Sequence, residues 1–128
     1  MNKCVLDASA ILAVLLNEPG NELLTDEVLA QSVAGTVNLA EVQTRMVRRG
    51  MPPGDAWKHA LVPVNEVITF TQDQARVAGT LVTQTRALGL SLGDRACLAL
   101  ALELKAPVYT ADKNWKKLDL GIPVHLIR

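Results

Sequence analysis

The sequence predicts an α/β fold, a three-layer α/β/α sandwich with a mostly parallel sheet of about five strands. Short apolar runs of the β type alternate along the chain with longer segments of helical periodicity. Hydrophobic residues make up 49% of the chain but aromatic residues only 3%, so the core must consist of aliphatic side chains on regular elements. A length of 128 residues suits a single domain, predicted to span residues 1–128.

The predicted elements alternate in the order expected for parallel strands joined by helices. The strands are Lys3–Leu6, Ser32–Val37, Val67–Phe70, Pro107–Thr110 and Pro123–Ile127. The helices are Ala8–Leu16, Asn21–Ala30, Asn38–Gly50, Asp55–Leu61, Thr71–Leu88 and Ala96–Leu104. We expect Asn21 and Asn38 to cap their helices at the N-terminus and Gly89 to end the longest one.

The pattern of apolar residues predicts a cytoplasmic protein that does not contact membranes. Asp7 interrupts the apolar stretch near the N-terminus, and no apolar run approaches membrane-spanning length. Cys4 and Cys97 lie inside apolar runs, so we expect both to be buried and free rather than joined in a disulfide.

The formal net charge is zero, which argues against a protein whose main role is non-specific binding to nucleic-acid phosphates. Any contact with RNA must therefore come from a local patch. Two basic clusters are present, one at Arg45, Arg48 and Arg49 and one at Lys113, Lys116 and Lys117. Each cluster fits either such a patch or an ordinary solvated helix face.

Four acidic residues fall at positions where an α/β sheet binds ligands. Asp7 and Asp112 follow predicted strands, while Glu41 and Asp94 lie in the first turns of predicted helices. Ligands of open α/β sheets bind at the carboxyl ends of the strands. We therefore expect these four side chains to converge there.

Carboxylates that converge in one pocket repel each other unless cations neutralise them. Oxygen ligands select Mg²⁺, with Mn²⁺ as the alternative, and such ions also bind substrate phosphates. His59 and His125 lie outside the acidic segments, so histidine acid–base catalysis is not expected. The acidic positions thus indicate metal-dependent phosphoryl chemistry.

Each acid also has a structural explanation that needs no ligand. Asp7 could cap the helix that follows it, and Asp112 could be an ordinary turn residue. Glu41 could pair with the arginine four residues further on, and Asp94 could form a capping box with Ser91. No single position decides between these readings.

Four segments in order resemble the PIN domains, specifically the VapC-type ribonuclease toxins of bacterial toxin–antitoxin pairs. The resemblance covers almost the whole chain. The segments are Val5-Leu6-Asp7-Ala8-Ser9-Ala10, Asn38-Leu39-Ala40-Glu41-Val42, Leu90-Ser91-Leu92-Gly93-Asp94-Arg95-Ala96-Cys97-Leu98-Ala99 and Tyr109-Thr110-Ala111-Asp112-Lys113-Asn114-Trp115.

The resemblance implies a PIN-like fold and a Mg²⁺-dependent endoribonuclease, with the four acids as catalytic and metal-binding residues. It also implies supporting roles for Ser9, Asn38 and Thr110, although Ser9 and Asn38 could equally satisfy backbone groups and Thr110 could simply favour a strand. The implied partners are an RNA substrate, a cognate antitoxin and a second copy of the chain in a homodimer.

The mechanistic hypothesis is that ions held mainly by Asp7 and Asp94 activate a water for in-line attack on an RNA phosphodiester. Such a reaction leaves 5′-phosphate and 3′-hydroxyl ends. A PIN-like nuclease of RNA processing or of structured DNA is the main alternative. A silent RNA-binding domain is less favoured because all four acids are present, and a receiver domain is less favoured because Asp7 stands alone after the first strand.

Overall fold

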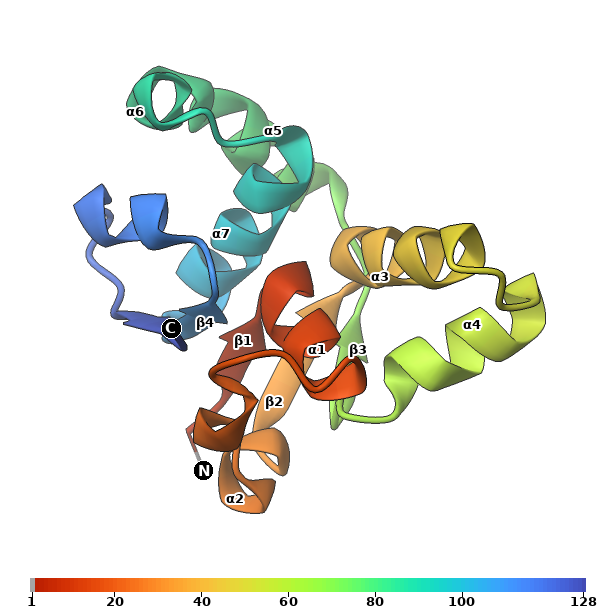
Figure 1. Cartoon of the computed structure of the whole chain (residues 1–128). Coiled ribbons are helices and arrows are strands. Elements are labelled where there is room, and N and C mark those ends of the chain that lie inside the picture. Colours follow the sequence, from red (N-terminus) through yellow and green to blue (C-terminus); the bar gives the residue numbers. More distant parts are fainter. Residues whose placement is uncertain (1) are drawn as a thin grey trace.

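Five parallel strands form the centre of the molecule in the computed structural model, which describes residues 2–128 (Figure 1). The strands are β1 (Cys4–Leu6), β2 (Ser32–Gly35), β3 (Glu66–Ile68), β4 (Val108–Thr110) and β5 (Val124–Leu126). They lie in the order β3-β2-β1-β4-β5, and every neighbouring pair is parallel. The predicted α/β class and the strand number are confirmed.

The helices pack on both faces of this sheet. They are α1 (Ala8–Leu15), α2 (Asp26–Leu29), α3 (Thr36–Arg48), α4 (Pro53–Leu61), α5 (Gln72–Thr80), α6 (Val82–Thr85) and α7 (Leu92–Leu104). Three 3-10 turns add η1 (Asn21–Leu23), η2 (Arg86–Leu88) and η3 (Lys113–Lys117). Figure 1 shows α3 and α4 on one side of the molecule and α5 and α6 on the other. In the described part of the chain, every helix is too short or too polar to span a bilayer.

Successive residues of the central strand β1 point into two separate cores. Leu6 packs with Ile11 and the other apolar residues of α1, α3 and α4, whereas Val5 packs with Leu98 and its neighbours on α7. Such alternation is a property of the pleated strand, whose side chains project to opposite faces in turn. The two cores account for the three predicted layers.

The long helix predicted over residues 71–88 is wrong as a single element. The structure divides it into α5, α6 and η2, and it leaves Ala75 and Val82 exposed. Gly79 and the β-branched Thr80 both have low helix propensity, which fits a break at this point. Gly89 does end the segment, with a left-handed φ of 69°.

The two predicted asparagine caps are also wrong. Thr25 caps α2 by accepting a hydrogen bond from Val28 N, while the Asn21 side chain donates to Glu18 O instead. Helix α3 begins at Thr36, so Asn38 lies inside its first turn and is buried. The expectation for the cysteines is confirmed, since both are buried and free.

Candidate active site

Asp7 occupies the carboxyl end of the central strand, beside the point where strand order reverses. The chain runs outward from β1 to β2 and β3 on one side, and β4 and β5 lie on the other. In open α/β sheets, ligands bind at such a reversal. Asp7 is the N-cap residue of α1, but its side chain makes no capping hydrogen bond. The carboxylate is therefore free for the interactions described next.

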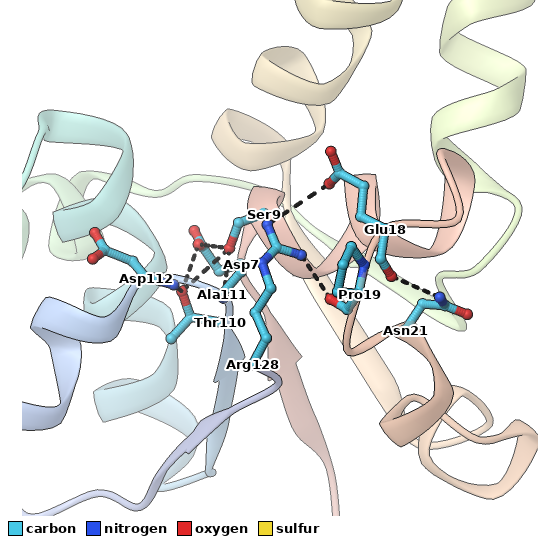
Figure 2. Close-up of polar contacts among 9 residues, drawn as sticks. All are labelled: Asp7, Ser9, Glu18, Pro19, Asn21, Thr110, Ala111, Asp112 and Arg128. Atoms are coloured by element: carbon cyan, nitrogen blue, oxygen red, sulfur yellow. Dashed lines mark hydrogen bonds and ion pairs between the residues drawn. The ribbon is translucent and has the colours of Figure 1, made fainter.

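Two hydroxyl groups hold the Asp7 carboxylate in place (Figure 2). Ser9 Oγ donates to Asp7 Oδ2 at 2.6 Å, and Thr110 Oγ1 donates to the same oxygen at 2.9 Å. Ser9 Oγ also accepts from Ala111 N, and Thr110 Oγ1 accepts from Asp112 N. The two hydroxyls thereby connect the end of β1 to the end of β4, where the sequence predicted supporting residues.

Burial makes the Asp7 carboxylate unusually basic. Only 4% of the residue is exposed. The pKa of Asp7 is raised from 3.8 to about 6, mainly because burial removes hydration from the carboxylate. The charges of Asp94 and Glu41 contribute to this rise, and the hydrogen bonds from Ser9 and Thr110 oppose it. Three acids from β1, α3 and α7 therefore act on one another electrostatically.

Glu41 reaches this region from the second turn of α3, not from the first turn as predicted, because the helix begins at Thr36. Asn38 Nδ2 donates to Glu41 Oε1 at 2.8 Å and to Gly93 O at 3.0 Å. Atoms packed around the carboxyl group raise the pKa of Glu41, the Asn38 hydrogen bond lowers it, and the charge of Asp94 raises it. Asn38 thus joins α3 to the first turn of α7.

The pairing of Glu41 with Arg45, one of the structural explanations, is not present among residues 2–128. Instead, the Glu41 carboxylate lies directly against Gly93. A Cβ atom added at Gly93 would overlap the carboxylate and would lie 2.6 Å from Glu41 Cδ. Any larger residue at this position must displace the acid.

Asp94 is the third residue of α7, and its carboxylate takes part in the helix cap. Asp94 Oδ2 accepts a hydrogen bond from Ser91 N at 2.8 Å, and Asp94 N donates to Ser91 Oγ at 3.2 Å. The capping box that the sequence suggested as a structural explanation is therefore present. Asp94 Oδ1 takes no part in these two hydrogen bonds, so Asp94 could cap the helix and bind a metal ion at the same time.

Asp112 lies near the site, but its carboxylate is used in a local cap. Asp112 Oδ1 accepts from Asn114 N at 3.0 Å and so caps η3. Its charge is not among those that raise the pKa of Asp7. Figure 2 shows the Asp112 side chain extending away from Asp7 on the far side of Thr110. The charge effects thus connect three of the four predicted acids, while the fourth caps η3.

The donor set fits a hydrated divalent cation. Within residues 2–128, no three acidic, histidine or cysteine side chains are close enough to bind one ion directly. Mg²⁺ does not need such a cage, because it keeps several waters and binds through one or two carboxylates. Asp7, Glu41 and Asp94 supply only oxygen atoms, and their mutual charge effects are those that a cation would relieve.

Cys97 and Trp115 are too deeply buried to take part in chemistry at the site. Cys97 is fully buried beneath the acids, and burial together with the charges of Asp7, Asp94 and Glu41 raises the pKa of its thiol well above its ordinary value. A protonated thiol is a poor nucleophile. Trp115 is also fully buried, so it cannot stack on a base.

Gly93 is the residue of this site to which the sequence analysis assigned no role. Glycine has a low helix propensity, so its presence at the start of an otherwise apolar helix can indicate a close approach by another group. That signal is weak without the structure, because the partner, Glu41, is 52 positions away in the sequence.

A family model for the PIN domain matches residues 4–120 of the sequence. That match spans most of the chain, and the all-parallel five-stranded sheet agrees with it. The chain therefore belongs to the PIN domain family. None of the curated proteins matches the sequence significantly.

Solved structures of toxin–antitoxin complexes share the fold. VapBC2 from Rickettsia felis, bound to a promoter DNA fragment, is similar at 19% identity and a TM-score of 0.71, over 94% of this chain and 96% of that one. A toxin–antitoxin complex from Klebsiella pneumoniae reaches a TM-score of 0.76 at 17% identity, covering 98% of each chain. VapBC-5 from Mycobacterium tuberculosis has 24% identity and a TM-score of 0.61, over 100% and 99%.

Proposed function

We propose that this PIN domain protein is a divalent-cation-dependent endoribonuclease and the toxin of a toxin–antitoxin pair. The observation that supports the proposal is that Asp7, Glu41 and Asp94 lie near enough for their charges to affect one another's carboxyl groups, without an ion pair to any of them among residues 2–128. Three carboxylates gathered in this way destabilise the protein unless they bind cations. A function in catalysis would explain why the protein keeps three carboxylates that reduce its stability.

The residues of this site would have separate roles in binding the cation and in positioning its ligands. Asp7 and Asp94 hold the cation, and Glu41 shapes its surroundings from α3. Ser9 and Thr110 fix the Asp7 carboxylate, and Asn38 fixes that of Glu41. A bound Mg²⁺ or Mn²⁺ would lower the pKa of an attacking water and neutralise charge on the leaving group.

Asp112 would serve the same site more indirectly. Its backbone N–H donates to Thr110 Oγ1, which in turn donates to Asp7. Its carboxylate would join the cation only after releasing Asn114 N. We therefore place Asp112 last among the four acids in its effect on cation binding.

The toxin assignment rests on the shared fold with chains from toxin–antitoxin complexes. It implies a cognate antitoxin that covers the acidic site, a homodimer and action in the cytoplasm. The apolar segments 12–16 and 23–29 are the proposed interface surfaces. Leu23 supports this choice because 52% of it is exposed.

The test is cleavage of a panel of end-labelled RNAs by purified protein, with Mg²⁺, with Mn²⁺ and with EDTA. Asp7→Asn is the matched control, because an amide oxygen can still accept the two hydroxyl hydrogen bonds without supplying the charge. We expect metal-dependent cutting that leaves 5′-phosphate ends and is lost in Asp7→Asn. Cyclic 2′,3′-phosphate products, or undiminished cutting in EDTA, would contradict the proposal.

A further inference from the structure

An open groove of about 590 Å³ lies between α1 and α3 and is lined in part by Glu41. Glu41 is the acid of the site that lines the groove. Ala8 and Leu12 of α1 and Val37 of α3 contribute apolar surface to the groove. The groove therefore includes Glu41, the acid proposed to shape the surroundings of the cation.

Two arginines form one wall of this groove. Arg45 and Arg48 follow Glu41 on α3 at spacings of four and seven residues, which place all three on one helix face. At 1.5 Å per residue, the arginines lie about 6 and about 10 Å beyond Glu41 along the helix axis. Both are exposed, and within the described chain neither forms an ion pair.

We infer that Arg45 and Arg48 bind the phosphates of the RNA strand that flank the one held at the acidic site. The inference rests on the proposed nuclease function and assigns a strand path to it. A polynucleotide whose scissile phosphate meets the carboxylates must carry its next phosphates away along a neighbouring wall. Guanidinium groups bind phosphate with paired hydrogen bonds, and this wall offers two of them free of acidic partners.

The charge of the whole chain strengthens the assignment. Because the formal net charge is zero, long-range attraction cannot hold RNA on this protein. Affinity must then come from a few local contacts. Arg45 and Arg48 are the basic residues that line a groove shared with an acid of the site. The apolar lining from Ala8 and Val37 can contact sugar and base edges, which do not need charged partners.

The experiment measures binding of a fluorescein-labelled single-stranded RNA of about 12 nucleotides by anisotropy, with Ca²⁺ replacing Mg²⁺, at several KCl concentrations. The test variant is Arg45→Gln/Arg48→Gln. The matched control is Arg76→Gln/Lys105→Gln, which removes the same charge from exposed residues on α5 and at the end of α7. Cleavage in Mg²⁺ and thermal melting are measured on the same proteins.

We expect the test variant to bind RNA roughly tenfold more weakly at low salt while melting like the wild type. The slope of log K against log[salt] should fall by about 1.4, since each phosphate contact to a single strand contributes about 0.7. In cleavage, KM should rise more than kcat falls. The control should retain the wild-type slope to within experimental error.

Equal RNA affinity and an equal salt slope in the test variant and the wild type would overturn the inference and would leave the groove for a protein partner. An equal loss in the control would overturn it as well, because the effect would then be one of net charge. Arginine-dependent binding without any cleavage would support the groove and count against the proposed nuclease. Failure of the groove assignment and failure of the nuclease proposal therefore give different experimental results.

Discussion

Asp7 shows how one residue can serve a site at the expense of the fold. Its folded-state pKa of about 6 lies above the ordinary value of 3.8, so the folded protein binds a proton that the unfolded chain releases. Stability from this group is therefore complete below about pH 4 and is lost as pH rises through 6. At 1.36 kcal/mol for each pKa unit, the loss is about 3 kcal/mol.

This linkage predicts a pH-dependent difference between the wild type and Asp7→Asn in EDTA. Relative to the variant, the wild type should lose about 3 kcal/mol of unfolding free energy between about pH 4 and pH 7. Urea unfolding at a series of pH values measures this difference. Parallel stability curves for the two proteins would show that the carboxylate is not desolvated in the folded state.

Gly93 gives a second prediction at the residue scale, because its neighbour is the flexible end of a side chain. In Gly93→Ala, the Glu41 carboxylate should move away from Asn38 while the fold remains intact. Residues that support a metal ligand typically affect affinity by 10-fold or more, so we expect about tenfold weaker Mn²⁺ binding by calorimetry.

Gly79→Ala is the matched control for this change. A Cβ at Gly79 of α5 meets nothing within 4 Å, so alanine there should stabilise the helix by up to about 1 kcal/mol and leave cation binding unchanged. Unaltered Mn²⁺ affinity in Gly93→Ala would show that the close approach to Glu41 has no role in the site.

At the scale of the element, α7 combines a buried body with a functional first turn. Its residues from Ala96 to Ala101 are all buried, and its capping box involves Ser91 and Asp94. The cap satisfies backbone groups at the end that faces the site. The position of Asp94 therefore depends on the same hydrogen bonds that start the helix.

Ser91→Ala removes the hydroxyl that accepts the Asp94 N–H, and we expect a loss of about 1 kcal/mol in unfolding free energy. Ser91→Thr keeps a capping hydroxyl and should lose much less. Chemical denaturation compares the three proteins. If Ser91→Ala and Ser91→Thr have the same free energy of unfolding, the capping hydroxyl contributes nothing to the stability of α7.

At the scale of the whole molecule, binding of a cation should stabilise the fold, because only the folded chain gathers the three carboxylates. At about 100 times the dissociation constant, a ligand adds about 2.7 kcal/mol, which is on the order of 10 °C in melting temperature for a chain of this size. We expect Mg²⁺ or Mn²⁺ to produce this rise in the wild type but not in Asp94→Asn. The same rise with KCl at equal ionic strength would indicate screening alone.

The order of strands and helices was predictable because it depends on local patterns. Apolar runs, Gly89 and the acids that follow strands all carry their signal within a few residues of sequence. The break within residues 71–88 and the true start of α3 were not predictable in this way. Asn38 resembles a helix cap in sequence, but tertiary contacts with Glu41 and Gly93 determine its actual place.

The sequence by itself determined the fold class and the acids worth testing, since hydrophobic periodicity and strand ends are local properties. Only the tertiary structure decided which acids meet: Asp7, Glu41 and Asp94 influence one another, whereas Asp112 caps η3. It alone also placed Arg45 and Arg48 beside a groove that Glu41 lines. The physical reason is that these relations join different elements, and their distances depend on how the helices pack against the sheet.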